Sequence, residues 1–304
     1  MKGYKSFGKG LICQGKQYAE NTVFEEDEVV VCQKGMHFCA EPMDVLDFYP
    51  PESEFAEVEA LDEAKTVTPH EYVSGKLKIG AKISLKELIN AQADIDFAKA
   101  KEEGSGNYAQ GDWGHAVAQG NCGHAAVGGT DAIAAALGDC GCAAAQGNWV
   151  HAAALGDSGH AIVQGNSGRA VAQGNLGHAV AQGDNGRAVA QGNWGHAVAQ
   201  SDNGHAVAQG NCGHAAAQGD GGHAAAQGDW GCAAVGGEDA IAAAFGVEGK
   251  AKARLGSWIM LAEWEHANDG WHIVTVKTAQ IDGEKLKADT WYMLQDGEFV
   301  EAED

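Results

Sequence analysis

The sequence is poor in several features that define common classes of protein. Only four of its 304 residues are proline, and no Ser/Pro-rich run marks a flexible linker. Its longest apolar runs are Ala-rich and interrupted by Gly, so no membrane-spanning helix and no membrane contact are expected. No apolar run follows the start at Met1–Lys5, so we expect no signal peptide. Together these absences predict a cytoplasmic protein.

Basic residues are also scarce. The chain has 20 Lys and Arg against 42 Asp and Glu, a net charge of −22. Such a surface repels nucleic acid, so direct nucleic-acid binding is not expected. An acidic mimic of nucleic acid stays open as an alternative, although the repeats described below have few carboxylates for tracing a phosphate path. The eight cysteines, without a signal peptide, indicate reduced thiols.

Catalytic motifs are missing as well. The sequence has no GxSxG, no phosphate-binding loop and no HExxH. A thiol enzyme built on Cys39 and His37 would need a third group to orient the base, and none is evident. We therefore expect a protein that is not an enzyme.

What the sequence does have is a nine-residue repeat. Residues 111–254 divide into 16 consecutive units of the form Gly-Asn-Trp-Gly-His-Ala-Val-Ala-Gln, without insertion or deletion. Position one is Gly in 15 units, with Ser201 as the exception, and position six is Ala in all 16. A fixed period of this kind is typical of solenoids.

The residue types at each position predict how the units fold. His-Ala-Val-Ala-Gln alternates as a short strand, and Gly-Asn-x-Gly forms a turn. Small residues at positions six and eight predict a thin core, with positions five, seven and nine facing outward. Gly at positions one and four is expected to supply unusual backbone angles, and Asn or Asp at position two to bond its own turn. The fold class is therefore mainly β, a β-solenoid or β-roll with two units per coil, although three per coil remain open.

The repeat resembles the RTX β-roll, whose nonapeptide is Gly-Gly-x-Gly-x-Asp-x-U-x. Its glycines and its inward apolar position match that pattern. The calcium-binding Asp is replaced by Ala in every unit, as at Ala116 and Ala125. Calcium is therefore an unlikely ligand, and no cofactor is required by the sequence.

Four segments are predicted. Residues 1–83 form a small, mainly β module with strands at Val23, 29–31, 55–58 and 77–83 and a short helix at 42–49. Residues 84–110 form a helix and linker, which begins with the capping box Ser84-x-x-Glu87. Residues 111–254 are the solenoid, and residues 255–304 are an antiparallel β-meander that caps it.

Two sets of residues carry metal-binding chemistry. With two units per coil, position five stacks four histidines, His160, His178, His196 and His214, which could share Zn²⁺ or respond to pH. The favoured interpretation is that they simply cover the sheet. The second set is Cys13, Cys32, His37 and Cys39, which lacks the CxxC pair of a standard zinc knuckle. Buried free thiols and a core histidine are favoured there.

Tryptophan at position three offers anchors for a protein partner. The four residues concerned are Trp113, Trp149, Trp194 and Trp230. Trp is enriched at the energetic centres of protein interfaces, although a turn Trp can also only shield its own coil.

Three stretches together resemble a family of bacteriophage and prophage accessory proteins without an assigned activity. These stretches are the opening module, with Cys13-x-Gly15, 35–39 and 42–50; the repeat array; and 251–258 with 288–294. The resemblance implies this layout, and no catalytic residues come with it. The relatives carry Thr/Asn/Ser-rich repeats where this chain has His-Ala-Val-Ala-Gln. A weaker resemblance is to trimeric adhesin heads.

The function expected from the sequence is therefore protein interaction through the rigid solenoid face, with a host or defence factor as partner. The alternatives are a virion-surface or adhesin component, a metal-binding or pH-responsive histidine column, and the acidic nucleic-acid mimic. The oligomeric state is open.

Overall fold

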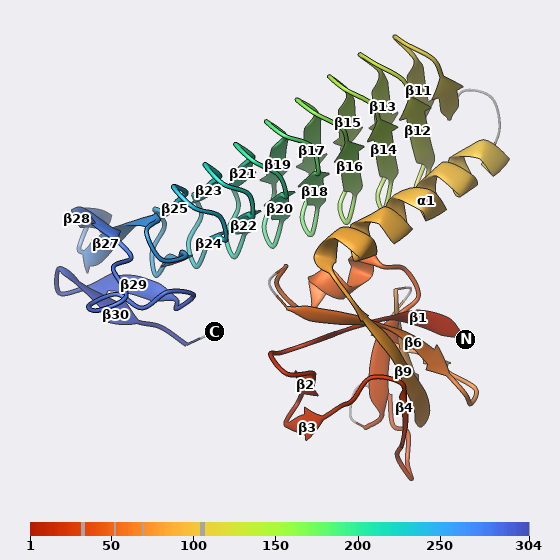
Figure 1. The fold of residues 1–304 in the computed structure, drawn as a ribbon, viewed down its shortest axis with the longest axis horizontal. Coiled ribbons are helices and arrows are strands. Elements are labelled where there is room, and N and C mark those ends of the chain that lie inside the picture. The colour runs from red at the N-terminus through yellow and green to blue at the C-terminus, as the bar shows by residue number, and fades with distance from the viewer. Residues whose placement is uncertain (32–33, 52, 69, 104–106, 304) are drawn as a thin grey trace. The chain divides into compact units, whose positions relative to one another are not determined.

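The computed structural model describes residues 1–31, 34–51, 53–68, 70–103 and 107–303. It divides into two compact units, Met1–Ile95 and Asp96–Asp304. The mainly β fold class with a solenoid is confirmed (Figure 1). Among the described residues, no helix is both long and apolar enough to cross a bilayer.

The first unit is built on an antiparallel sheet of seven strands in the order β4-β9-β6-β1-β5-β8-β7. Its core contains Phe7, Met36, Phe38, Leu77 and Ile79, all buried. The elements of this unit are β1 (Lys2–Phe7), β2 (Ile12–Cys13), β3 (Lys16–Gln17), β4 (Thr22–Glu25), β5 (Met36–Cys39), the 3-10 helix η1 (Met43–Asp47), β6 (Glu54–Ala60), β7 (Lys65–Thr66), β8 (Glu71–Ser74) and β9 (Lys76–Ile83).

The predicted strand at residues 29–31 is wrong. Only an isolated bridge between Val30 and Lys34 forms there. Val29 instead lies against Gly35 and Gly75, where a Cβ atom on either glycine would meet its methyl groups. Three consecutive valines lack the alternation that pairs one face of a strand with a core, so a loop that packs one of them is favoured.

Helix α1 (Leu85–Glu103) begins at the predicted capping box. The amide of Glu87 donates to Ser84 Oγ at 3.2 Å, and the amide of Ser84 donates to Glu87 Oε2 at 2.7 Å. These hydrogen bonds lower the pKa of the Glu87 carboxyl. The helix spans the boundary between the two units, and Asp96 belongs to the second.

The solenoid strands alternate between two parallel sheets, and each strand pairs with the one 18 residues later, as Ala116 does with Ala134. Two units per coil are therefore confirmed, in about nine turns between residues 108 and 261. Sheet I contains β10 (Tyr108–Gln110), β12 (His124–Gly128), β14 (Cys142–Gln146), β16 (His160–Gln164), β18 (His178–Ala181), β20 (His196–Ala199), β22 (His214–Ala217), β24 (Cys232–Val235) and β26 (Lys250–Lys252). Sheet II contains β11 (His115–Ala118), β13 (Ile133–Ala136), β15 (His151–Ala154), β17 (Arg169–Gln173), β19 (Arg187–Gln191), β21 (His205–Ala208), β23 (His223–Ala226) and β25 (Ile241–Ala244).

Two hairpins close the array, one in each sheet. Strands β27 (Trp258–Ala267) and β28 (Gly270–Gln280) extend sheet II, and β29 (Tyr292–Gln295) and β30 (Glu298–Glu301) extend sheet I. The C-terminal segment therefore caps the solenoid by continuing both of its sheets.

The core between the sheets is as thin as predicted. Ala at positions six and eight is buried throughout, as at Ala188 and Ala190. Position four also faces inward, because Val150, Ala132 and Ala240 replace Gly there and are fully buried. The expectation that position four needs an unusual backbone angle is therefore wrong. Its glycines have ordinary φ angles, and a Cβ at Gly195 would lie 3.0 Å from the Cβ of Ala190.

Position one is glycine because successive coils stack there through their backbones. A Cβ atom on Gly192 would overlap the carbonyl group of Gly174, one coil earlier. Gly120, in the first coil, has no coil before it, and a Cβ there would meet nothing within 4 Å. The requirement is thus set by the neighbouring coil.

The left-handed backbone lies at position three, where the sequence gave no warning of it. All 16 units have a positive φ there, and only Gly221 among them is glycine. This conformation costs about 1–2 kcal/mol for a residue with a side chain. It directs the amide at the next coil, so that Trp194 N donates to the carbonyl of Asn211 at 2.9 Å.

Position two also links successive coils. The side-chain oxygen of Asn175 accepts from the amide of Asn193 at 3.1 Å, and Asn193 accepts from Asn211 at 3.0 Å. The expectation that these side chains bond their own turn is therefore wrong. Asn and Asp are used because each supplies an acceptor that reaches the coil above.

Replacing a stacking glycine should be far more costly than replacing one at the end of the stack. We expect Gly192→Ala to lower the free energy of unfolding by at least about 3 kcal/mol, because two backbones must separate. Gly120→Ala meets no atom but has φ +104°, so it should cost only about 1–2 kcal/mol of backbone strain. Urea unfolding followed by tryptophan fluorescence measures both, and equal losses would contradict the stacking explanation.

Candidate functional site

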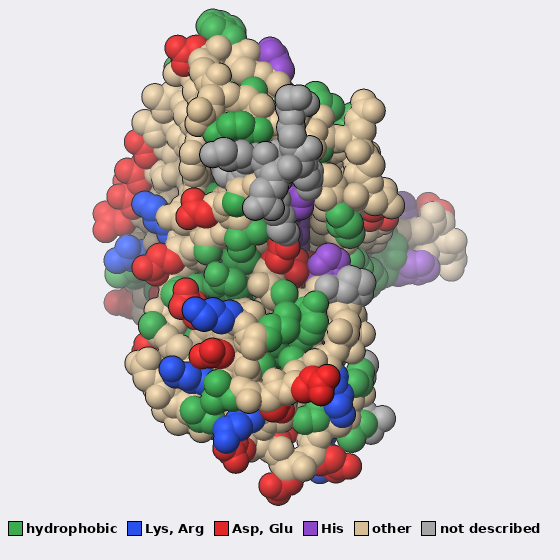
Figure 2. Space-filling view, turned by 90° about the vertical axis from the view of Figure 1, so that its right-hand side faces the viewer, with side chains coloured by type: hydrophobic (Ala, Val, Ile, Leu, Met, Phe, Trp, Pro, Cys, Tyr) green, Lys and Arg blue, Asp and Glu red, His purple; other side chains and the backbone are tan. Residues whose placement is uncertain are grey.

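The first unit contains a cavity of about 460 Å³. Figure 2 shows that basic and acidic side chains are interspersed over the surface of this unit, so neither sign of charge dominates the face in view. Six residues with reactive or polar side chains line the cavity: Lys5, Cys13, Tyr18, His37, Cys39 and Tyr49. Three of the four residues in the predicted cysteine cluster are thus brought together, and Cys32 lies outside the described residues.

Lys5 is the unexpected member of this set. Strand β1 places it inside the unit, where its Nζ donates to the carbonyl of His37 at 2.7 Å. The ammonium also lies 5.5 Å and 5.7 Å from the ring centres of Phe7 and Tyr18. Burial lowers the pKa of Lys5, while neighbouring groups, Cys13 first among them, oppose that shift.

The thiols and the imidazole of the cavity have separate partners. Cys13 Sγ lies 3.2 Å from the Tyr49 hydroxyl, and His37 Nδ1 lies 3.2 Å from Glu71 Oε1. Burial raises the pKa of the Cys39 thiol, with further contributions from nearby carboxylates. A thiol held protonated is a poor nucleophile and a poor metal ligand. His37 is oriented by a carboxylate, but Cys39 is not activated beside it.

The cavity can hold a small molecule through directed polar groups. His37 Nε2 is buried and has no hydrogen-bond partner among the described residues. With the Lys5 ammonium and the Tyr49 hydroxyl, it offers three polar atoms on otherwise apolar walls, which is the composition typical of ligand sites.

The four predicted histidines of sheet I do stack. Ring centres of His160, His178, His196 and His214 are separated by 5.0, 4.9 and 4.9 Å in order. The rings lie on the face of the sheet away from the alanine core, yet His160, His178 and His196 are buried and His214 is half-buried. The expected solvent-exposed column is therefore wrong for sheet I. In sheet II, His115, His151, His205 and His223 are exposed at the same repeat position.

The stacking geometry does not favour a shared metal ion. The ring planes of His178, His196 and His214 are parallel to within 6°. A ring nitrogen binds metal in the plane of its ring, so parallel rings direct their lone pairs side by side and not at one point between them. Within the described residues, the one set of three close His, Cys, Asp or Glu donors lies elsewhere.

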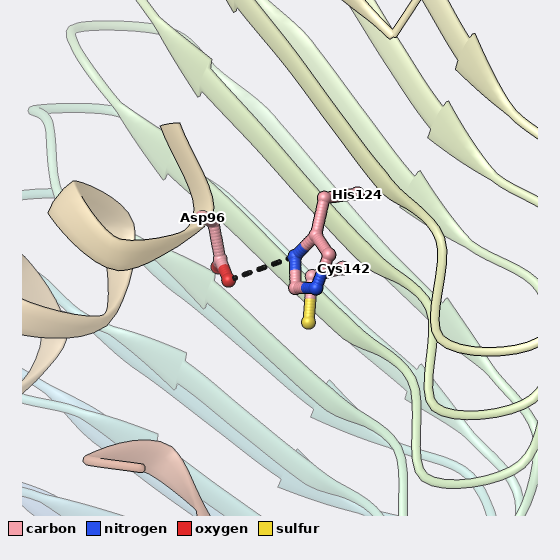
Figure 3. Close-up of side chains that lie close together, drawn as sticks. All are labelled: Asp96, His124 and Cys142. Carbon is pink, nitrogen blue, oxygen red and sulfur yellow. Dashed lines mark ion pairs between the residues drawn. The ribbon is translucent and has the colours of Figure 1, made fainter. Parts of the chain in front are cut away.

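That set consists of Asp96, His124 and Cys142, whose donor atoms all lie within 4.8 Å of one another (Figure 3). His124 and Cys142 occupy position five of neighbouring strands in sheet I, and Asp96 comes from α1. The sequence placed His124 and Cys142 in one column but gave no signal for Asp96, which lies in a helix more than 25 residues earlier.

The predicted tryptophan anchors are all exposed, but they do not form one surface. Trp113 and Trp149 lie in turns that lead from sheet I to sheet II, whereas Trp194 and Trp230 lie in turns that lead back. The two pairs therefore occupy opposite edges of the solenoid. The Trp230 indole donates to Glu248 Oε2, one coil later, at 3.0 Å.

Comparisons with known proteins give one match. A family model described as a domain of unknown function, DUF7666, matches residues 1–91. No curated protein and no solved structure matches the chain. The match covers the unit that contains the cavity and stops before the solenoid.

Acid should destabilise the solenoid through His196. Burial, together with His178 and His214, holds the pKa of His196 well below 6.5 in the folded chain. The unfolded state therefore binds the proton more readily, so stability is unaffected above about pH 6.5 and falls as pH is lowered below it. Urea midpoints read from tryptophan fluorescence at pH 7.5 and 5.5 should show this loss, and His196→Asn should reduce it.

The readout separates the two units, because all eight tryptophans lie between Trp113 and Trp291. The first unit has an opposite contribution. A hydrogen bond to Asp44 raises the pKa of His70, so its stabilisation is present below pH 6.5 and is lost as pH rises through the raised value. A tryptophan-detected midpoint that is the same at pH 7.5 and 5.5 would contradict the role of His196.

Proposed function

We propose that this protein is a non-enzymatic interaction protein that binds a partner protein through the outer face of sheet II. The observation that carries the proposal is the combination of exposed apolar and cationic side chains on this face. The outer face of sheet I, by contrast, is largely buried at positions five and seven.

The first coils of sheet II expose an apolar patch. It consists of four side chains, each about two-fifths exposed: Val117, Ile133, Leu137 and Leu155. They come from neighbouring strands and turns of successive coils, so they are adjacent on the sheet. Exposed apolar groups that cluster in this way mark interaction sites more often than scattered ones do.

The middle coils of the same face are cationic. Arg169 and Arg187 pair across neighbouring strands, and both are exposed. Positions five, seven and nine of sheet II contain no carboxylate from β11 to β25, in a chain whose net charge is −22. The acidic residues of the array lie in the turns at its edges. This charge pattern fits a partner with an acidic stripe beside an apolar contact.

Further support for a binding role comes from the cavity. Its thiols and its histidine are not arranged as nucleophile and base, so nothing in that group favours covalent catalysis. The resemblance to phage accessory proteins makes a bacterial host or defence factor the partner of choice, met in the cytoplasm. A virion-surface or adhesin role is the alternative, and it requires the protein in purified particles.

The acidic-mimic alternative is favoured by one feature. Asp184, Asp202, Asp220 and Glu238 occupy position two of four successive coils along one edge. Stacked coils place them about 4.8 Å apart. A DNA-handling enzyme bound through this edge would show strong salt dependence and would be insensitive to changes on sheet II.

Two variants with the same change in net charge distinguish the face from the edge. Arg169→Gln with Arg187→Gln removes two positive charges from sheet II. Asn185→Asp with Asn203→Asp adds two negative charges at position three, in exposed turns of adjacent coils. We expect the face variant to weaken partner retention about tenfold or more, since interface arginines often contribute over 1 kcal/mol each. The edge variant should retain the partner.

The measurement uses the immobilised full-length chain, bacterial lysate and quantification of each retained protein. A photo-cross-linking residue at Val189, on the same face, should then form an adduct with the protein whose retention the face variant lowers. Equal retention by wild type and the face variant, or an adduct formed only from Trp194 at the edge, would refute the proposal.

A further inference from the structure

We propose that Asp96, His124 and Cys142 form a binding site for a transition-metal ion, with Zn²⁺ as the ion whose chemistry the three donors fit best. The inference is independent of the partner-binding role of sheet II, because it concerns the other sheet. It also differs from both metal sites expected from the sequence.

The donors converge from three separate elements. His124 and Cys142 are register partners on β12 and β14, and both side chains project from the outer face of sheet I. Asp96 of α1 approaches the same point, where its Oδ1 lies 3.4 Å from His124 Nδ1 (Figure 3). All three donor atoms fall within 4.8 Å of one another. A tetrahedral zinc site has donors roughly 3.3–3.8 Å apart, given its bond lengths, so small side-chain rotations close the set.

Burial separates this set from an ordinary surface cluster. Asp96 is fully buried, and His124 and Cys142 are 7% and 6% exposed. A buried carboxylate is stable only with compensating positive charge nearby. A protonated His124 supplies one charge through the ion pair. A metal ion supplies two and also accepts the thiolate of Cys142, which the ion pair leaves unused.

The donor types select the ion. One carboxylate oxygen, one imidazole nitrogen and one thiolate sulfur are all common zinc ligands, whereas calcium and magnesium prefer oxygen donors alone. Cys142 pairs with His160 in the next strand of the sheet. That imidazole is about one strand spacing away, which makes His160 the residue closest in register for a fourth ligand, with water as the other choice.

The chain contains its own control for this site. His214 and Cys232 repeat the same two donors in the same register, on β22 and β24. Within the part of the chain that the structure describes, this second pair does not belong to a set of three close donors. The carboxylate of Asp96 is therefore what distinguishes the first pair. An ion held there would join α1 to the first coils and add to their stability by mass action.

Cobalt is the most informative probe, because a Co²⁺–thiolate bond gives a charge-transfer absorption that oxygen and nitrogen ligands do not. We expect the reduced, chelator-treated full-length chain to bind one equivalent of Co²⁺ with this absorption, and Zn²⁺ to displace it. Cys142→Ser should abolish the absorption, and Asp96→Asn should weaken Co²⁺ binding at least tenfold. Cys232→Ser, the matched control, should bind as wild type does.

Zn²⁺ should also raise the urea midpoint of the wild type and of Cys232→Ser, but not that of Cys142→Ser. Tryptophan fluorescence of the metal-free variants establishes that each is folded. Three results would overturn the proposal: no saturable Co²⁺ absorption in the wild type, an absorption that survives Cys142→Ser, or one that is lost on Cys39→Ser and so belongs to the first unit. The Asp96–His124 ion pair alone would then account for the cluster.

Discussion

The stacking of each coil on the backbone of the coil before it, 18 residues earlier, is the constraint on which the solenoid depends. Gly192 has no room for a Cβ above Gly174, and Trp194 adopts a left-handed backbone to direct its amide at Asn211. Asn193 extends the same link through its side chain. Positions one and two, and the backbone of position three, thus serve the stack, and the alanines serve the core. The side chains left free to vary are those of positions three, five, seven and nine.

The sequence was sufficient for the architecture because the period itself fixes the register. It was insufficient for the environment of each side chain. His196 and His205 lie in the same phrase, Gly-His-Ala-Val-Ala-Gln, yet His196 is buried in sheet I and His205 is exposed in sheet II. Local sequence cannot distinguish them, because what differs is the surroundings of each sheet. The left-handed turn was missed for a related reason. Trp, Cys, Leu and Ser at position three carry no local signal for a positive φ, and only the neighbouring coil explains it.

The candidate sites show the same limit. Cys13, His37 and Cys39 were grouped from sequence and do line one cavity, but the partners that decide their chemistry, Tyr49 and Glu71, come from separate segments. Asp96 was unpredictable because a helical carboxylate normally faces solvent. In both places the reactive residues were visible in the sequence, whereas the residues that set their protonation or complete their coordination required the fold.

Repetition also multiplies electrostatic effects, because identical side chains stack at one strand spacing. Like charges that face each other across strands repel, and this explains why long runs of arginine are absent from sheet II and why histidine alternates with Arg169 and Arg187. Burial, followed by His223 and Arg187, lowers the pKa of His205, so the middle coils resist taking on further positive charge. A partner that brings carboxylates to this face relieves the repulsion between the two arginines. The binding energy of such a contact therefore includes a cost that the free solenoid already carries, which is a physical reason for a repeat protein to concentrate its cations on one exposed face.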